Sequence, residues 1–213
     1  MNENRFPIAS RRTFLIGASA LALSGCSSIL SPPQPPKLYP LKPSGGLPTS
    51  GSKVDWQLSV VTPSANETLG GTHIVLIQSD GSIDFYADAA WTDDLPVLIR
   101  NATVEAFEAS GRIGAVAADT DGLHTDYMLQ SELRQFAARY DTMDGIPTAV
   151  VRIEAKLATS AQRDILASHV FAQETQATEN SVPAVIRAFD TGLGPVLSDM
   201  VNWALSTAPP VKR

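Results

Sequence analysis

The chain has 213 residues, a formal net charge of −6 and a single cysteine, Cys26. This length suits one domain with a sizeable hydrophobic core. The acidic balance, without a cluster of lysine and arginine, argues against nucleic acid as a partner and against electrostatic docking on anionic lipid. One cysteine cannot form an internal disulfide, so the folded part must be stabilised by core packing.

Residues 1–25 have the features of an export signal. Three arginines precede the uncharged apolar run 14–23, whose ten residues are half of the ~20 that a membrane-spanning helix needs. Two small residues, the second of them Gly25, then precede Cys26. We therefore predict cleavage between Gly25 and Cys26 and attachment of lipid to the Cys26 thiol. The alternative is a cysteine that follows the apolar run by chance.

Arg11 and Arg12 leave the export route open. Together with their neighbours they resemble the twin-arginine signal, which exports a domain already folded. Alternatively, the two arginines only supply the positive charge that the general secretion route requires. Ser27 stands where an aspartate would be expected to retain a lipoprotein in the inner membrane, so we expect the outer membrane, facing the periplasm.

Cleavage leaves 188 of the 213 residues, and because the removed segment carries +2, their net charge is about −8. Residues 26–36 combine the lipidated cysteine with a proline-rich stretch, which favours an extended tether. Residues 37–206 are predicted as the folded domain and 207–213 as a C-terminal tail. No cofactor is expected apart from the covalent lipid on Cys26.

The first half of the domain contains strand signals. Residues 38–41 predict a short edge strand and residues 57–61 a second strand. Residues 73–78 and 83–86 are apolar β-formers that flank Ser-Asp-Gly-Ser at 79–82, a pattern typical of a hairpin.

An amphipathic helix is predicted next. Thr92, Asp93 and Asp94 offer a cap, Pro96 suits the first turn and Gly111 ends the run. The apolar stripe consists of Leu95, Leu98, Ile99, Ala102, Ala106 and Ala109.

Three long segments with period-two patterning follow, at 125–140, 148–159 and 164–175, and predict half-buried antiparallel strands. A final helix is expected over 182–205, kinked or split by Pro195. The order of elements predicts an α+β fold: a single domain with a mainly antiparallel sheet and two amphipathic helices packed on one face.

No motif predicts catalysis or metal binding. Residues 46–53 approach a phosphate-binding loop, but the final serine and lysine are in the wrong order. Residues 119–122 lack the further ligands of a calcium loop. His73, His124 and His169 are far apart, and no nucleophile elbow is present. We expect a protein without enzyme activity.

Trp91 and Trp203 are candidates for contact with a partner. Each lies at the end of a predicted helix. The alternative is that both rings pack in the core, as aromatic residues at helix ends more often do.

The order of these motifs resembles the ABC-type transport auxiliary lipoprotein family. The family pattern is a lipid-attachment motif, a Tyr-x-Leu start, Tyr-x-x-x-x-Trp, a Leu-Pro-x-Leu-Ile helix ending in Ala-Ser-Gly-Arg, and a last helix with Ala-Phe-Asp. The matching segments are 23–26, 39–41, 86–91, 95–99, 109–112 and 188–190. Pro195 departs from the pattern, because it interrupts a helix that is expected to continue.

The resemblance implies a role in a lipid-transport assembly. Its partners would be an ATPase, an inner-membrane permease and a periplasmic mammalian cell entry (MCE) domain protein. Such systems move phospholipid or other hydrophobic molecules across the envelope, and the lipoprotein would be the outer-membrane docking component. Exposed strand edges suit pairing with another chain, including a homo-oligomer. The alternative is a free-standing structural envelope lipoprotein or a weak periplasmic hydrolase.

Overall fold

The computed structural model describes residues 35–45 and 51–211. The predicted export signal with Arg11 and Arg12, the cleavage site at Gly25, and the lipid-attachment residue Cys26 all lie outside the described residues. Residues Pro36–Arg213 form one unit.

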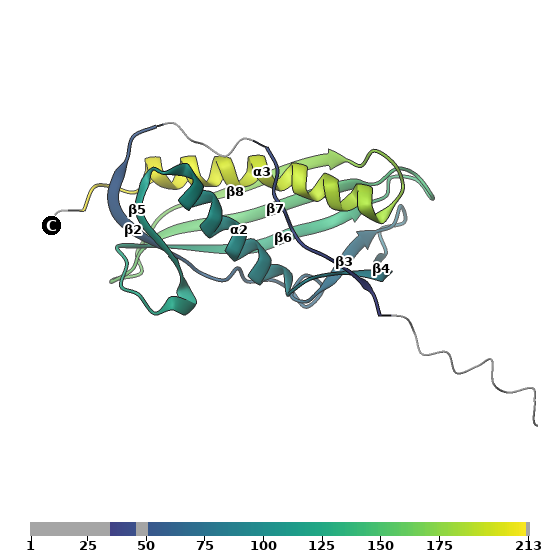
Figure 1. Cartoon of the computed structure of the whole chain (residues 1–213), viewed down its shortest axis with the longest axis horizontal. Coiled ribbons are helices and arrows are strands. Elements are labelled where there is room, and N and C mark those ends of the chain that lie inside the picture. The colour runs from purple at the N-terminus through teal and green to yellow at the C-terminus, as the bar shows by residue number, and fades with distance from the viewer. Residues whose placement is uncertain (1–34, 46–50, 212–213) are drawn as a thin grey trace, which may run out of the picture. The chain divides into compact units, whose positions relative to one another are not determined.

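The described elements are eight strands, two α-helices and one 3₁₀ turn (Figure 1). In chain order they are β1 (Lys37–Tyr39), β2 (Val54–Val60), β3 (His73–Ile77), β4 (Ile83–Trp91), α2 (Leu95–Ser110), β5 (Ile113–Ala118), η1 (Asp119–Asp121), β6 (Tyr127–Arg139), β7 (Thr148–Thr159), β8 (Ile165–Gln176) and α3 (Val182–Thr207).

All eight strands belong to one mixed sheet built around β6. On one side, β6 pairs along its whole length with β7, which pairs with β8, and both of these long ladders are antiparallel. On the other side, the start of β6 pairs with β2, and β5 lies beyond it. The end of β6 pairs with β3, followed by β4 and β1. These shorter pairings are parallel except for the β3–β4 hairpin.

Both helices cover the same face of the sheet (Figure 1). Helix α2 packs on β5 and β2, helix α3 packs on β7 and β8, and the two helices contact each other. The other face carries polar side chains such as Gln130 and Arg152, which are exposed. This arrangement confirms the predicted α+β fold with a largely antiparallel sheet and two helices on one face.

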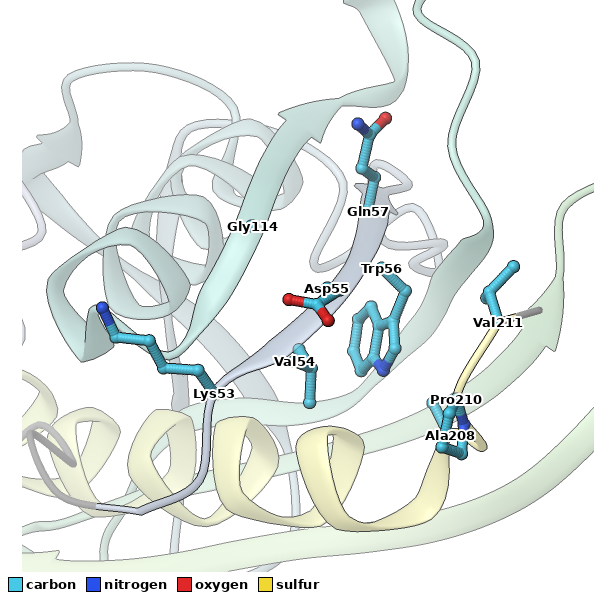
Figure 2. Close-up of a pocket in the computed structure, with 9 residues that line it drawn as sticks. All are labelled: Lys53, Val54, Asp55, Trp56, Gln57, Gly114, Ala208, Pro210 and Val211. Atoms are coloured by element: carbon cyan, nitrogen blue, oxygen red, sulfur yellow. The ribbon is translucent and has the colours of Figure 1, made fainter. Parts of the chain in front are cut away.

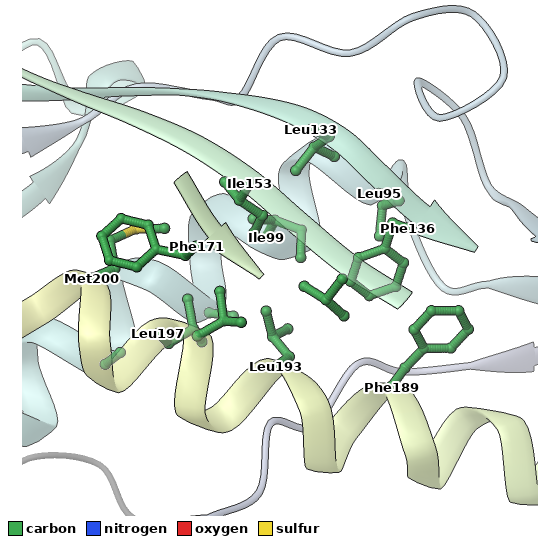
Figure 3. Packing of buried hydrophobic residues seen from close by; sticks show 14 of the residues in the cluster. Leu95, Ile99, Leu133, Phe136, Ile153, Phe171, Phe189, Leu193, Leu197 and Met200 are labelled. Atoms are coloured by element: carbon green, nitrogen blue, oxygen red, sulfur yellow. The ribbon is translucent and has the colours of Figure 1, made fainter. Parts of the chain in front are cut away.

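The core lies between the sheet and the helices (Figure 3). Phe136 on β6 stacks on Phe189 of α3, with ring centroids 4.5 Å apart. Leu193, Leu197 and Met200 continue the apolar side of α3 toward β7 and β8. Each fully buried side chain of this size stabilises the fold by about 1.5–3 kcal/mol, so this packing replaces the disulfides that the domain lacks.

The predicted helix after residue 94 forms, with small differences. Gly111 ends α2 in the left-handed conformation, with φ 61°, as predicted. Asp94 occupies the N-cap position, but its side chain makes no capping hydrogen bond. Ala109 is exposed, whereas Phe107, absent from the predicted stripe, is fully buried.

Two further features differ from the sequence-based predictions. Of the two effects predicted for Pro195, a kink or a split, the split is wrong, because α3 runs unbroken over 26 residues. Proline removes one intrahelical hydrogen bond, but Leu193, Val196 and Leu197 on both sides of it are buried and hold the helix on the sheet. Strand β5 was missed, since its six residues are mostly small and follow directly after α2.

Candidate interaction surfaces

Trp91 lies in the core and is not an interaction residue. Its side chain is 1% exposed. The ring makes edge-to-face contacts with Phe136 and Phe189, at centroid distances of 5.9 and 5.7 Å. A partner has no surface of Trp91 to contact, so the predicted contact role is wrong for this residue and the core-packing alternative holds.

Trp203 lies at the margin of the core and is half-buried. Its ring meets Phe171 of β8 edge to face at 5.7 Å and lies 6.2 Å from the ring of His169. Trp203 thus packs against the inner side of β8, while part of its ring lies outside the core. It remains a candidate for contact with a partner protein.

Strand β8 presents a long edge. Of the strands in the described residues it pairs only with β7, so its other side has no strand partner. The exposed apolar side chains on it are Ile165, Leu166 and Val170, at 61%, 38% and 42%. The strand contains neither proline nor lysine, which commonly protect an edge from pairing. We call β8 with Trp203 the β8 edge.

A segment near the N-terminal end of the domain crosses α3. The backbone N–H of Lys42 donates to Oδ1 of Asp190 at 2.7 Å, and that of Ser44 donates to the Asp190 carbonyl at 2.9 Å. Burial raises the pKa of the Asp190 carboxyl, although the Lys42 amide opposes the shift. At Gly194 a Cβ atom would overlap the carbonyl of Ser44. The Asp of Ala-Phe-Asp therefore fixes residues 42–45 across the helix.

The tyrosine of the Tyr-x-x-x-x-Trp motif also has a structural role. Tyr86 and Tyr140 share a hydrogen bond of 2.9 Å between their hydroxyls, and Tyr140 donates to Asn180 at 2.9 Å. Burial, more than the hydrogen bond to Tyr140, raises the pKa of the Tyr86 phenol. The Tyr86 phenol is neutral at physiological pH, and its hydrogen bond links β4 to the residue that follows β6.

Ion pairs cross the polar face of the sheet. Arg139 donates from its two Nη atoms to the carboxylate oxygens of Glu174, at 3.0 and 2.9 Å, and from Nε to Asp141 at 3.0 Å. The hydrogen bond from Arg139 lowers the pKa of Glu174. Arg134 bonds Glu154 and lowers its pKa in the same way. These surface pairs, in which Glu154 is the most covered side chain at 16% exposed, link β6, β7 and β8 without enclosing a site.

The histidines do not converge on a site. His73 packs against Phe85 at 4.8 Å, His169 packs against Phe171 at 4.6 Å, and His124 is exposed in a loop. Within residues 35–45 and 51–211, no group of three or more His, Cys, Asp or Glu side chains has the geometry to hold a metal ion. In the same part of the chain, neither α2 nor α3 has the length and apolar character to cross a membrane.

A cavity of about 670 Å³ lies beside the first half of β2 (Figure 2). It is lined by residues 53–57, by Gly114 of β5, and by Ala208, Pro210 and Val211 after α3. Trp56, which no sequence motif marks as functional, is 2% exposed and forms part of the lining. Its position before a predicted strand looked like that of any core residue.

The fold and these surfaces define a class: a single-domain α+β protein whose prominent exposed features are a sheet edge and a cleft beside a strand. The chain belongs to the ABC-type transport auxiliary lipoprotein family, because the model of the "ABC-type transport auxiliary lipoprotein component" matches residues 39–201. The description of this family is that of the lipoprotein component that is auxiliary to an ABC-type transport system.

Three known proteins are similar to this chain in structure or in sequence. Protein XCC0632 from Xanthomonas campestris is 30% identical, with a TM-score of 0.68 over 81% of this chain and 93% of that one. A second solved structure, of an uncharacterized protein, is 18% identical with a TM-score of 0.61 over 82% and 100% of the two chains, and supports the fold alone. An uncharacterized Bradyrhizobium diazoefficiens protein, bll6063, is 21% identical over 78% of this chain, which spans only 44% of that protein's length.

Proposed function

We propose that this protein is the non-enzymatic outer-membrane docking component of an ABC transport system that contains an MCE-domain protein. The system would move phospholipid or another hydrophobic molecule across the bacterial envelope. A covalent lipid on Cys26 would hold the domain at the membrane, facing the periplasm. The MCE-domain protein, its permease and its ATPase would be the partners.

The β8 edge carries the proposal. Its strand has twelve residues, and three of them, Ile165, Leu166 and Val170, are exposed apolar residues. A strand of another chain pairs with such an edge through backbone hydrogen bonds, while alternate side chains supply specificity. The MCE-domain protein, or a second copy of this chain in a homo-oligomer, would dock there. Family membership supports the association with a transporter.

An affinity pull-down from crosslinked, detergent-solubilised envelopes tests the proposal. The wild-type protein with a C-terminal tag should recover the MCE-domain protein together with the permease and the ATPase. The double variant Leu166→Lys, Val170→Lys places two charges on the β8 edge and should reduce recovery at least about fivefold. Gln130→Lys is the matched control, because Gln130 is exposed on β6 away from that edge.

The anchor is tested in the same experiment. Cys26→Ala should abolish acylation and lower the recovery of membrane partners. If the wild-type protein is acylated and in the outer membrane yet recovers none of the three partners, the docking role is wrong. A free-standing structural lipoprotein would then be the better hypothesis, and a screen for weak hydrolase activity would follow.

A further inference from the structure

The cavity beside β2 has the shape of a slot along a strand edge. Its lining includes the five consecutive residues 53–57. Lys53 precedes β2, and the β2–β5 register shifts between Val54 and Gln57, so the usual alternation of side chains is interrupted there and consecutive residues line one cavity. The facing wall, with Ala208, Pro210 and Val211, is also a non-helical stretch of chain that follows α3 (Figure 2).

The register of the sheet explains why the slot is present. The β2–β6 ladder begins at Leu58, opposite Tyr127. Just before it, Asp126 takes the place of a strand residue: its Oδ2 accepts from the N–H of Gln57 at 2.8 Å, and its own N–H donates to the Gln57 carbonyl at 3.1 Å. Before Gln57, β6 no longer accompanies β2, and the slot lies where a neighbouring strand would otherwise run.

Trp56 contributes a buried donor without an acceptor. Its Nε1 is buried and, among the described residues, has no hydrogen-bond partner. The edge of the indole that carries Nε1 is turned toward the segment with Ala208 and Pro210 (Figure 2). Buried polar groups are nearly always hydrogen-bonded in folded proteins, so this N–H is the atom of the slot that a ligand would satisfy.

Contacts around Trp56 hold the opposite wall in place. The ring meets Tyr127 edge to face at a centroid distance of 5.1 Å. The Tyr127 hydroxyl in turn donates to the carbonyl of Pro209 at 2.8 Å. The indole and the segment after α3 are therefore linked through one tyrosine, which keeps the slot preformed.

We propose that this slot binds an extended peptide segment of a partner protein, with a backbone carbonyl of the peptide accepting a hydrogen bond from Trp56 Nε1. Val54, Pro210 and Val211 provide apolar contacts for alternate side chains of the peptide. A neutral acceptor suits the site, because the slot residues Lys53 and Asp55 carry opposite charges. The volume is within the range of about 300–1,000 Å³ that is usual for ligand sites.

The site is separate from the β8 edge and does not depend on the transport role. Peptide binding at the slot is tested with the full-length acylated protein in detergent micelles. The immobilised protein selects binders from a phage-displayed library of random dodecapeptides. Enriched peptides are synthesised and titrated by fluorescence anisotropy and by the indole N–H resonances of ¹⁵N-labelled protein. Trp56→Phe assigns the Trp56 resonance and removes the indole N–H together with the pyrrole part of the buried ring.

Enriched peptides should shift the Trp56 indole resonance and leave those of Trp91 and Trp203 in place. Trp56→Phe should weaken their binding at least about tenfold, because the loss of one buried hydrogen bond accounts for about that factor and the smaller ring also makes fewer contacts. Val211→Glu should also weaken it, with no change to the core, since Val211 is exposed. Trp203→Phe should leave the affinity unchanged.

Three results would overturn the proposal. The first is that repeated selections enrich no peptide, and the second is that enriched peptides bind Trp56→Phe as tightly as the wild-type protein. The third is that dihexanoyl phosphatidylethanolamine, added below its micellar concentration, shifts the Trp56 resonance when peptides do not. The slot would then be a lipid site.

Discussion

Strands β7 and β8 are neighbours of equal length, but the side chains of β7 are much more buried than those of β8. On β7 the alternate residues Val151, Ile153, Ala155 and Leu157 are all fully buried. On β8 only Phe171 is buried, and three large apolar side chains are exposed. Both strands contact α3, but β7 has strands on both sides and β8 on one. The comparison separates residues that stabilise the fold from residues that remain accessible to another chain.

The largest effect expected from this comparison comes from truncating one isoleucine on each strand. Ile153→Ala on β7 should lower the free energy of unfolding by about 3 kcal/mol, because it leaves a cavity in the core. Ile165→Ala on β8 should change it by less than about 0.5 kcal/mol, since that side chain is 61% exposed. Urea unfolding of the mature domain at pH 7 measures both. Equal decreases in the free energy of unfolding would mean that the side chains of β8 are as buried as those of β7.

A second test concerns the helix that covers both strands. Gly194→Ala should lower the free energy of unfolding by about 2 kcal/mol, because the added methyl group overlaps the carbonyl of Ser44. Without such an overlap, alanine in place of glycine stabilises a helix by about 1 kcal/mol. The sign of the change in the free energy of unfolding therefore tells whether the overlap is present. Thr191→Ala, at an exposed position of α3, is the control and should be within about 0.5 kcal/mol of the wild-type protein. If Gly194→Ala stabilised the protein, residues 42–45 would not pass over α3 at Gly194 as the structure shows.

The contact of residues 42–45 with α3 also predicts that the free energy of unfolding depends on pH through Asp190. Asp190→Ala removes the acceptor of the Lys42 N–H and should lower the free energy of unfolding by about 1 kcal/mol. Because burial raises the pKa of this carboxyl in the folded state, its contribution is full below the unfolded pKa and is lost as pH rises through the folded pKa.

Asp190→Asn keeps the acceptor oxygen and removes the titration. Its stability should therefore lack the decrease with rising pH that the wild-type protein has above the ordinary aspartate range. Thermal unfolding from pH 3 to pH 7 compares the two proteins. Identical pH profiles would show that Asp190 does not titrate differently in the folded state.

The smallest expected effect is on the ion pair that crosses β7 from β6 to β8. Glu174→Gln should lower the free energy of unfolding by about 0.5 kcal/mol at pH 7, and less in high salt, because the pair with Arg139 is exposed. The pKa of Glu174 is lowered in the folded state, so its contribution is present above the ordinary glutamate pKa and is lost as pH falls through the folded pKa. The variant and the wild-type protein should then converge at pH 3 in urea titrations.

Local patterns in the sequence determined most of the elements. Period-two alternation located β6, β7 and β8 within two residues at each end, and Gly111 marked the end of α2. The Ser-Asp-Gly-Ser turn between β3 and β4 was equally readable, since Asp80 accepts from the N–H of Ser82 at 2.9 Å. Such signals act over a few neighbouring residues and therefore need no knowledge of the fold.

Tertiary structure decided what distant segments do to one another. Pro195 predicts a kink or a split in α3, and packing on both sides of it keeps the helix unbroken. Trp91 and Trp203 have similar positions at helix ends, yet only the arrangement of α3 and the sheet makes one fully buried and the other half-buried. The slot at Trp56 exists because the β2–β6 ladder begins at Leu58. Burial and strand register depend on contacts between residues far apart in the chain, which a pattern along the chain does not contain.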